Sequence, residues 1–71
     1  MDQILKVGQT YICRNGMTAK IKSEHKQYQR YPFRGDIYNQ DGTISRLAYF
    51  SLNGAYNLDA DSVFDIIKPL N

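Results

Sequence analysis

The chain has 71 residues and a mass of 8.2 kDa, so it fits one small domain near the lower limit for folding without disulfides, metals or further subunits. Its composition, 42% hydrophobic and 23% charged, is that of a globular chain and excludes a disordered one. The single cysteine, Cys13, excludes an intrachain disulfide and a cysteine-based zinc cluster, which favours a reducing compartment. No apolar run is long enough for a membrane span, and residues 1–7 are too short and polar for a signal peptide, so we expect a cytoplasmic protein with no membrane partner.

The net charge of +2 is unevenly distributed along the chain. Residues 1–34 hold seven of the nine Lys and Arg residues and two acidic residues, a balance of +5, whereas residues 35–71 have a balance of −3. Segregated charge of this kind favours an anionic partner on one face. The alternative is that the two halves interleave in one sheet, so that the charges mix.

Three dipeptides suit the tight turns of β-hairpins, because Gly and Asn reach positive φ easily: Asn15-Gly16, Asp41-Gly42 and Asn53-Gly54. The strands that we predict around them, in chain order, are residues 10–13, 17–23, 33–39, 43–52, 55–57 and 64–68. Alternating apolar and polar residues in 17–23 give the clearest strand pattern.

Between the strands, residues 24–30 are polar and lack any apolar period, so they should form a loop that leads to Pro32 at a strand entry. A single helical turn is predicted at residues 59–62, where Asp and Ser cap free amide groups well. The fold class is therefore all-β: one domain, residues 1–71, with five to six short strands in an antiparallel meander that forms a curled sheet or an SH3-like barrel. The core is expected to contain Val7, Tyr11, Cys13, Met17, Ala19, Ile21, Phe33, Ile37, Leu47, Tyr49, Leu52, Val63, Phe64 and Ile66.

No catalytic motif is complete, and we predict a protein that is not an enzyme and has no cofactor. His25 is the only histidine, and it lies in a charged loop with no nucleophile assigned to it by a motif. Asp59, Asp61 and Asp65 resemble part of a calcium loop, but the glycine and the terminal glutamate of such a loop are missing. Helix capping explains these acidic residues better, so no metal site is predicted.

In residues 26–34, cationic side chains alternate with aromatic rings. Arginine offers a planar donor fork to phosphate and tyrosine offers a stacking face to a base, so this segment predicts a nucleotide-like ligand. Gly35, beside Arg34, would let such a ligand approach the backbone. The alternative is that Tyr31 and Phe33 are buried, Pro32 shapes the strand entry and the cations are merely solvated. The candidate ligand-binding residues are Lys26, Tyr28, Arg30, Tyr31, Arg34 and Arg46.

Several short motifs follow one another along the whole chain. They are Val7-Gly8-Gln9-Thr10-Tyr11, Arg14-Asn15-Gly16-Met17-Thr18-Ala19-Lys20-Ile21, Tyr31-Pro32-Phe33-Arg34-Gly35, Asp41-Gly42, Asn53-Gly54-Ala55-Tyr56 and Asp65-Ile66-Ile67. In this order the chain resembles a group of short, largely uncharacterised phage and prophage accessory proteins. These pair a strand–R-x-G–strand hairpin with a later Y-P-x-x-G segment and a D-G turn. The resemblance carries no catalytic residue.

The resemblance implies a phage accessory protein in the host cytoplasm that antagonises antiviral defence. The leading hypothesis is a non-enzymatic homo-oligomer that sequesters an anionic nucleotide-like ligand, with Arg and Tyr from two chains forming the pocket. The alternatives are an inhibitor that binds the surface of a host defence protein, such as a CRISPR complex, and a small DNA- or RNA-binding module. A hydrolase of a nucleotide signal is the remaining alternative, for which no motif is present. Composition does not separate the first two hypotheses, whereas the net charge of +2 and the five acidic residues after residue 34 leave little continuous basic surface for nucleic acid.

Overall fold

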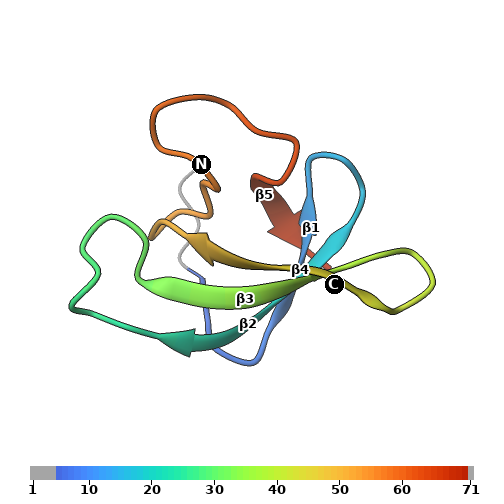
Figure 1. The fold of residues 1–71 in the computed structure, drawn as a ribbon, viewed down its shortest axis with the longest axis horizontal. Coiled ribbons are helices and arrows are strands. Elements are labelled where there is room, and N and C mark those ends of the chain that lie inside the picture. Colours follow the sequence, from blue (N-terminus) through green and yellow to red (C-terminus); the bar gives the residue numbers. More distant parts are fainter. Residues whose placement is uncertain (1–4, 71) are drawn as a thin grey trace.

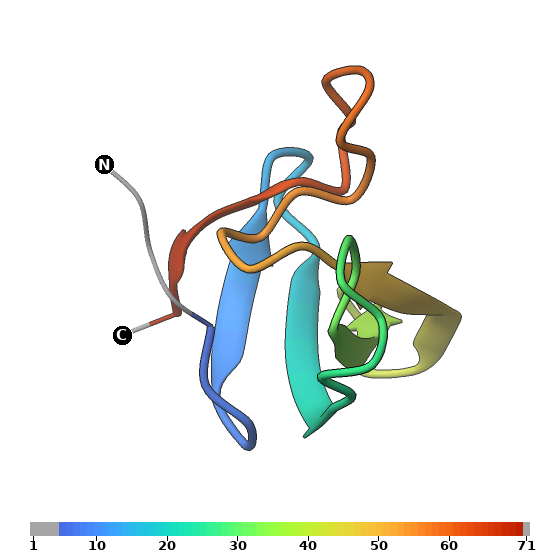
Figure 2. The ribbon, with the colours of Figure 1, turned by 90° about the vertical axis from the view of Figure 1, so that its left-hand side faces the viewer.

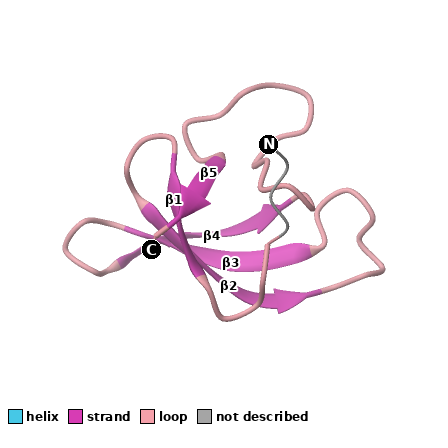
Figure 3. Cartoon of the chain, turned by 180° about the vertical axis from the view of Figure 1, so that it is seen from behind, coloured by secondary structure: helices cyan, strands magenta, loops and turns pink. Residues whose placement is uncertain are grey.

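The computed structural model describes residues 5–70, which form five strands and no helix (Figures 1 and 3). The strands are β1 (Thr10–Cys13), β2 (Thr18–Glu24), β3 (Phe33–Tyr38), β4 (Ile44–Phe50) and β5 (Ile66–Pro69). They form one antiparallel sheet in the order β4-β3-β2-β1-β5. The predicted all-β meander is therefore confirmed, and β5 returns to the far side of β1.

The sheet is twisted and stays open, since β4 and β5 are its two edges and do not pair with each other (Figure 1). The long segment 51–65 crosses the opening between these edges without regular secondary structure. The turn that follows β4 lies against the start of β5, because the Ile66 N–H donates to the Gly54 carbonyl at 2.9 Å. Gly54 has a φ of +93°, and a Cβ at this position would lie 2.9 Å from the Cβ of Ile66. Only glycine fits such a turn without strain.

The first hairpin forms as the Asn15-Gly16 dipeptide predicts. Gly16 has a φ of +87°, and its N–H donates to the Cys13 carbonyl at 2.9 Å. Across the two strands, Tyr11 faces Ala19. The turn chemistry therefore sets the register of β1 and β2.

Three local predictions for the second half of the chain are wrong. Residues 59–62 form no helical turn, residues 55–57 form no strand, and β5 begins at Ile66 rather than at residue 64. The physical reason is the buried carboxylate of Asp65, which accepts hydrogen bonds from the backbone N–H groups of Tyr56 and Ser62, at 2.8 and 3.0 Å. These two bonds, the first across nine residues and the second across three, hold the segment in an irregular path. Because the described residues form no helix, none of them forms one that is long and apolar enough to cross a membrane.

The core lies on the inner face of the sheet and differs from the prediction mainly in β4. Leu47 and Tyr49 were expected inside but are 46% and 40% exposed, whereas Ala48 and Phe50 are 3% and 0% exposed. Both faces of this strand carry apolar residues, so its pattern does not define the inner one, and a shift of one residue reverses every side chain. Val7, Leu52 and Val63, also predicted inside, are exposed residues outside the strands, and Met17 and Phe64 are only partly buried. The buried apolar residues are Leu5, Tyr11, Cys13, Ala19, Ile21, Phe33, Ile37, Ala48, Phe50 and Ile66.

Candidate functional site

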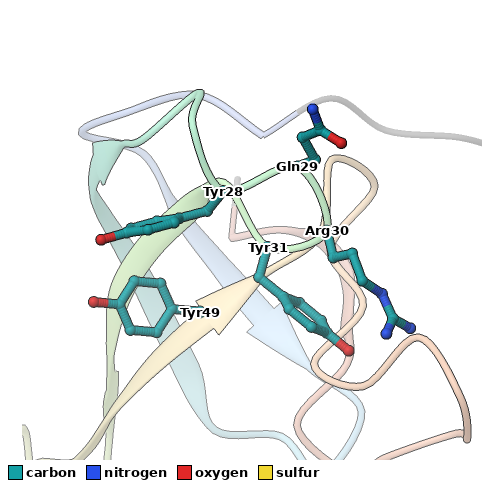
Figure 4. A pocket seen from close by; sticks show the side chains of 5 residues that line it. All are labelled: Tyr28, Gln29, Arg30, Tyr31 and Tyr49. Carbon is teal, nitrogen blue, oxygen red and sulfur yellow. The ribbon is translucent and has the colours of Figure 1, made fainter.

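The loop between β2 and β3 lies beside the end of β4 (Figure 2). A shallow depression of about 570 Å³ lies there, and Figure 4 shows the side chains that line it. Three tyrosines, one arginine and one glutamine line it: Tyr28, Gln29, Arg30, Tyr31 and Tyr49. Its volume is within the range of small-molecule sites, and we call it the tyrosine depression.

The loop that carries four of these residues is closed by its own backbone. The His25 N–H donates to the Pro32 carbonyl at 2.6 Å, and the Tyr28 N–H donates to the His25 carbonyl at 2.9 Å. Pro32 is buried at the entry to β3, as the sequence predicts for a residue that fixes the entry angle. The loop therefore presents its aromatic and cationic side chains outward from a fixed base.

Tyr28 and Tyr49 form one side of the depression (Figure 4). Their rings meet edge to face, at 89° with 6.2 Å between the centroids, a favourable geometry for two aromatic rings. Tyr49 points outward from β4 because its neighbours Ala48 and Phe50 point into the core. Tyr28 and Tyr49 are 50% and 40% exposed, so both leave ring surface open to a ligand.

Tyr31 and Arg30 form the other side and point together away from the Tyr28–Tyr49 pair (Figure 4). The Tyr31 hydroxyl accepts a hydrogen bond from the Leu58 N–H at 2.9 Å, which holds its ring against the 51–65 segment. The Arg30 guanidinium lies 5.7 Å from the centre of the Tyr31 ring and forms an ion pair with Asp59 at 3.0 Å. Both partners of this pair are well exposed, so it is held weakly.

A second depression, of about 400 Å³, adjoins the first and shares Tyr31 and Tyr49 with it. Its other lining residues come from β4 and from the segment that follows Gly54: Leu47, Ala48, Tyr56 and Asn57. The two depressions form a continuous surface that four tyrosines line.

The structure brings together half of the six candidate ligand-binding residues. Tyr28, Arg30 and Tyr31 line the tyrosine depression. Lys26 is exposed in the same loop but outside the lining. Arg34 is half-buried on β3, paired in register with Tyr49. Arg46 contacts another part of the molecule, where its guanidinium lies 4.4 Å from the centre of the Phe64 ring.

The role predicted for Gly35 is wrong. This glycine is buried, and a Cβ there would lie 2.6 Å from the backbone oxygen of Lys20. The missing side chain therefore permits β2 and β3 to pack closely, and it does not open the backbone to a ligand.

Sequence reasoning missed Tyr49 and Gln29. Gln29 lies inside residues 26–34, but its amide is not part of the alternation of cations and rings that predicts the site. Tyr49 was assigned to the core, although comparison with Phe50 offers a signal, because a tyrosine hydroxyl favours the wetter of two apolar faces. The pairing of β3 with β4 then places Tyr49 beside the loop.

His25 forms one side-chain contact that the sequence does not predict. The Ser23 hydroxyl and His25 Nε2 share a hydrogen bond of 2.9 Å. Among the described hydrogen bonds, none joins a carboxylate to this imidazole, so the pair lacks the orienting group of a triad. Within residues 5–70, no three His, Cys, Asp or Glu side chains gather closely enough to hold a metal ion.

Comparisons of the chain with protein-family models, with curated proteins and with solved structures found no match.

Proposed function

We propose that this chain is a non-enzymatic binding module whose tyrosine depression takes an anionic nucleotide-like ligand. The observation that supports the proposal most is the gathering of Tyr28, Tyr31 and Tyr49 with Arg30 around one depression. In the phage setting that the sequence resemblance implies, such binding would withdraw a nucleotide signal from a host defence system.

The chemistry of the lining matches the two halves of a nucleotide. Exposed tyrosine rings stack on bases of any sequence, and each stacked base contributes about 1–3 kcal/mol. Beside them, the planar fork of Arg30 suits a phosphate, and the amide of Gln29 offers both a donor and an acceptor to a base edge. The depression therefore combines an apolar stacking surface with one cation.

A phosphate must compete with Asp59 for Arg30, and this competition costs little. The pair joins two well-exposed side chains, and such pairs contribute about 0.2–1 kcal/mol. A phosphate carries more charge than one carboxylate and can accept both arms of the guanidinium fork. Lys26, in the same loop, adds positive potential, and residues 25–32 contain no acidic residue that opposes it.

The direct test is calorimetric titration of the purified chain with a panel of linear and cyclic mono- and dinucleotides, followed by recovery and mass analysis of the ligand. We expect one ligand class to bind and to be recovered intact. Arg30→Gln should weaken the binding, while Lys68→Gln, which removes an exposed cation on β5, should leave it unchanged.

Each rival function predicts a different result in the same experiment. An altered ligand whose turnover disappears in Ser23→Ala would indicate an enzyme. Tighter binding of long single strands than of any nucleotide would indicate a nucleic-acid module. Absence of binding across the panel would contradict the proposal and favour a protein target.

A further inference from the structure

The two edges of the sheet differ in how well they are protected against pairing with another strand. Exposed edges are commonly blocked by shortness, by lysine and by proline. The β5 edge has all three features, with four residues that include Lys68 and Pro69, and the Ile66 N–H bonds to the Gly54 carbonyl. This edge is closed to a further strand.

The β4 edge has none of these three features, and the β-bulge in its pairing with β3 lies near its start, at Ser45, so that Arg46–Phe50 pair regularly. The strand is seven residues long and contains no proline and no lysine. Among the described residues, no group outside β3 forms a hydrogen bond with the backbone of Ile44–Phe50. A row of backbone N–H and C=O groups is therefore free along this edge.

The outer face of β4 is also apolar. Ile44 and Leu47 are 58% and 46% exposed, and Tyr49 lies on the same side. The only charged side chain of the strand, Arg46, is directed to the Phe64 ring instead. On the same face, the register partners of Tyr49 and Leu47 on β3 are Arg34 and Asp36, which are half-buried. An edge strand whose own outer side chains are apolar, beside a free row of backbone groups, is a surface that proteins usually cover.

We infer that β4 pairs antiparallel with β4 of a second copy of this chain, which joins two sheets into one. The regular part of this edge, Arg46–Phe50, offers donors and acceptors in alternation, so the same segment of an identical strand in antiparallel orientation satisfies them. This contact is two-fold symmetric and closes at the dimer. A second copy fits better than a foreign charged partner because the face of β4 carries no charge to select one, and a 71-residue domain with an open sheet has little core of its own.

The inference does not depend on a nucleotide ligand, but it bears on the site. The smaller depression lies along Leu47, Ala48 and Tyr49, so the second copy would form a wall beside it. Dimerisation and ligand binding can then be measured separately on the same protein.

The test is light scattering and sedimentation of the full chain over low to high micromolar concentrations, with two matched variants. Leu47→Lys places a charge on the β4 edge, and Ile67→Lys places the same charge on β5 at a position of similar exposure, 48% against 46%. We expect a dimer for the wild type and for Ile67→Lys. Loss of a buried leucine contact in the dimer should raise its dissociation constant at least about tenfold in Leu47→Lys.

Circular dichroism will show whether Leu47→Lys folds, and Ile44→Lys replaces it if it does not. Amide exchange supplies a second measure, since β4 amides should become more protected as concentration rises. A wild type that stays monomeric at high micromolar concentration would overturn the inference. So would a dimer that tolerates both β4 substitutions, or one that Ile67→Lys disrupts as strongly.

Discussion

The edge-to-face contact between Tyr28 and Tyr49 joins the loop after β2 to the outer face of β4. It exists because β4 buries Ala48 and Phe50 and so directs Tyr49 outward, to where the closed loop holds Tyr28. The face that β4 buries thus determines whether Tyr49 can form the aromatic side of the tyrosine depression with Tyr28.

Replacing Tyr49 tests this side of the depression. Tyr49→Ala should weaken nucleotide binding by about 1–3 kcal/mol, since it removes one stacking surface. Stability should fall by only about 1 kcal/mol, because the ring is exposed and contributes one aromatic pair. Tyr49→Phe keeps the ring and should bind nearly as the wild type does. Calorimetry and urea unfolding measure the two effects, and unchanged affinity in Tyr49→Ala would remove this residue from the site.

Removing Asp59 should strengthen the binding of an anion. Asp59→Asn frees the Arg30 guanidinium from its only described ion-pair partner, so affinity for a phosphate-bearing ligand should rise about two- to fivefold. Affinity for the matching uncharged nucleoside should not change. Asp61→Asn, an exposed acid in the same segment, is the control. An equal gain in both variants would indicate a general charge effect rather than release of Arg30.

Asp65 should be essential to stability. Its buried carboxylate accepts two backbone N–H groups and contacts Arg14 at 3.4 Å, so Asp65→Ala leaves buried donors unpaired. We expect a loss of about 2–4 kcal/mol in urea unfolding. Asp61→Ala should change stability by less than about 0.5 kcal/mol. A mild effect of Asp65→Ala would show that the 51–65 segment is held by other contacts.

Stability should fall in alkaline solution because of Cys13. Burial, aided by the negative charge of Asp65, raises the pKa of this thiol from 9.0 to about 11. The unfolded chain releases the proton above pH 9 while the folded chain keeps it, so the stabilisation is complete below pH 9 and is lost as the pH rises towards 11. Unfolding midpoints measured across this range should fall less steeply in Cys13→Ala. Identical slopes would contradict this account, as would rapid alkylation of the folded thiol at neutral pH.

Alanine substitutions at Gly16 and Gly54 should distinguish the loss of stability caused by backbone strain from the loss caused by a steric clash. Gly16 and Gly54 both have positive φ, but a Cβ meets nothing within 4 Å at Gly16 and meets Ile66 at 2.9 Å at Gly54. Gly16→Ala should therefore cost about 1–2 kcal/mol and Gly54→Ala at least about 1 kcal/mol more. Thermal and urea unfolding give the comparison. Equal costs would mean that the turn around Gly54 shifts freely.

Local patterns predicted much of the sheet because its turns are encoded locally. Asn15-Gly16 fixed the first hairpin, and the alternation in residues 17–23 identified β2. The face of β4 was not predictable in the same way, since Leu47 and Tyr49 compete with Ala48 and Phe50 for the inside. The path of residues 51–65 was missed because the bond from the Tyr56 N–H to Asp65, nine residues further along the chain, belongs to no short pattern.

The candidate site was predictable where it lies within one segment. The alternation of cations and rings in residues 26–34 located Tyr28, Arg30 and Tyr31. Tyr49 reaches the site only through the pairing of β3 with β4, and Arg46 leaves it because β4 turns that side chain to Phe64. The pairing of strands that are distant in sequence decides where both side chains lie, and the residue types alone do not predict it.

Chemical-shift mapping tests the central claim most directly. Amide and aromatic resonances of the isotope-labelled protein would be followed during titration with the nucleotide of highest affinity from the panel. We predict that the largest changes fall on Tyr28, Gln29, Arg30, Tyr31 and Tyr49, and that Arg46 and the β1–β2 hairpin change little. Changes centred elsewhere, or spectra that stay constant with every nucleotide, would contradict the account.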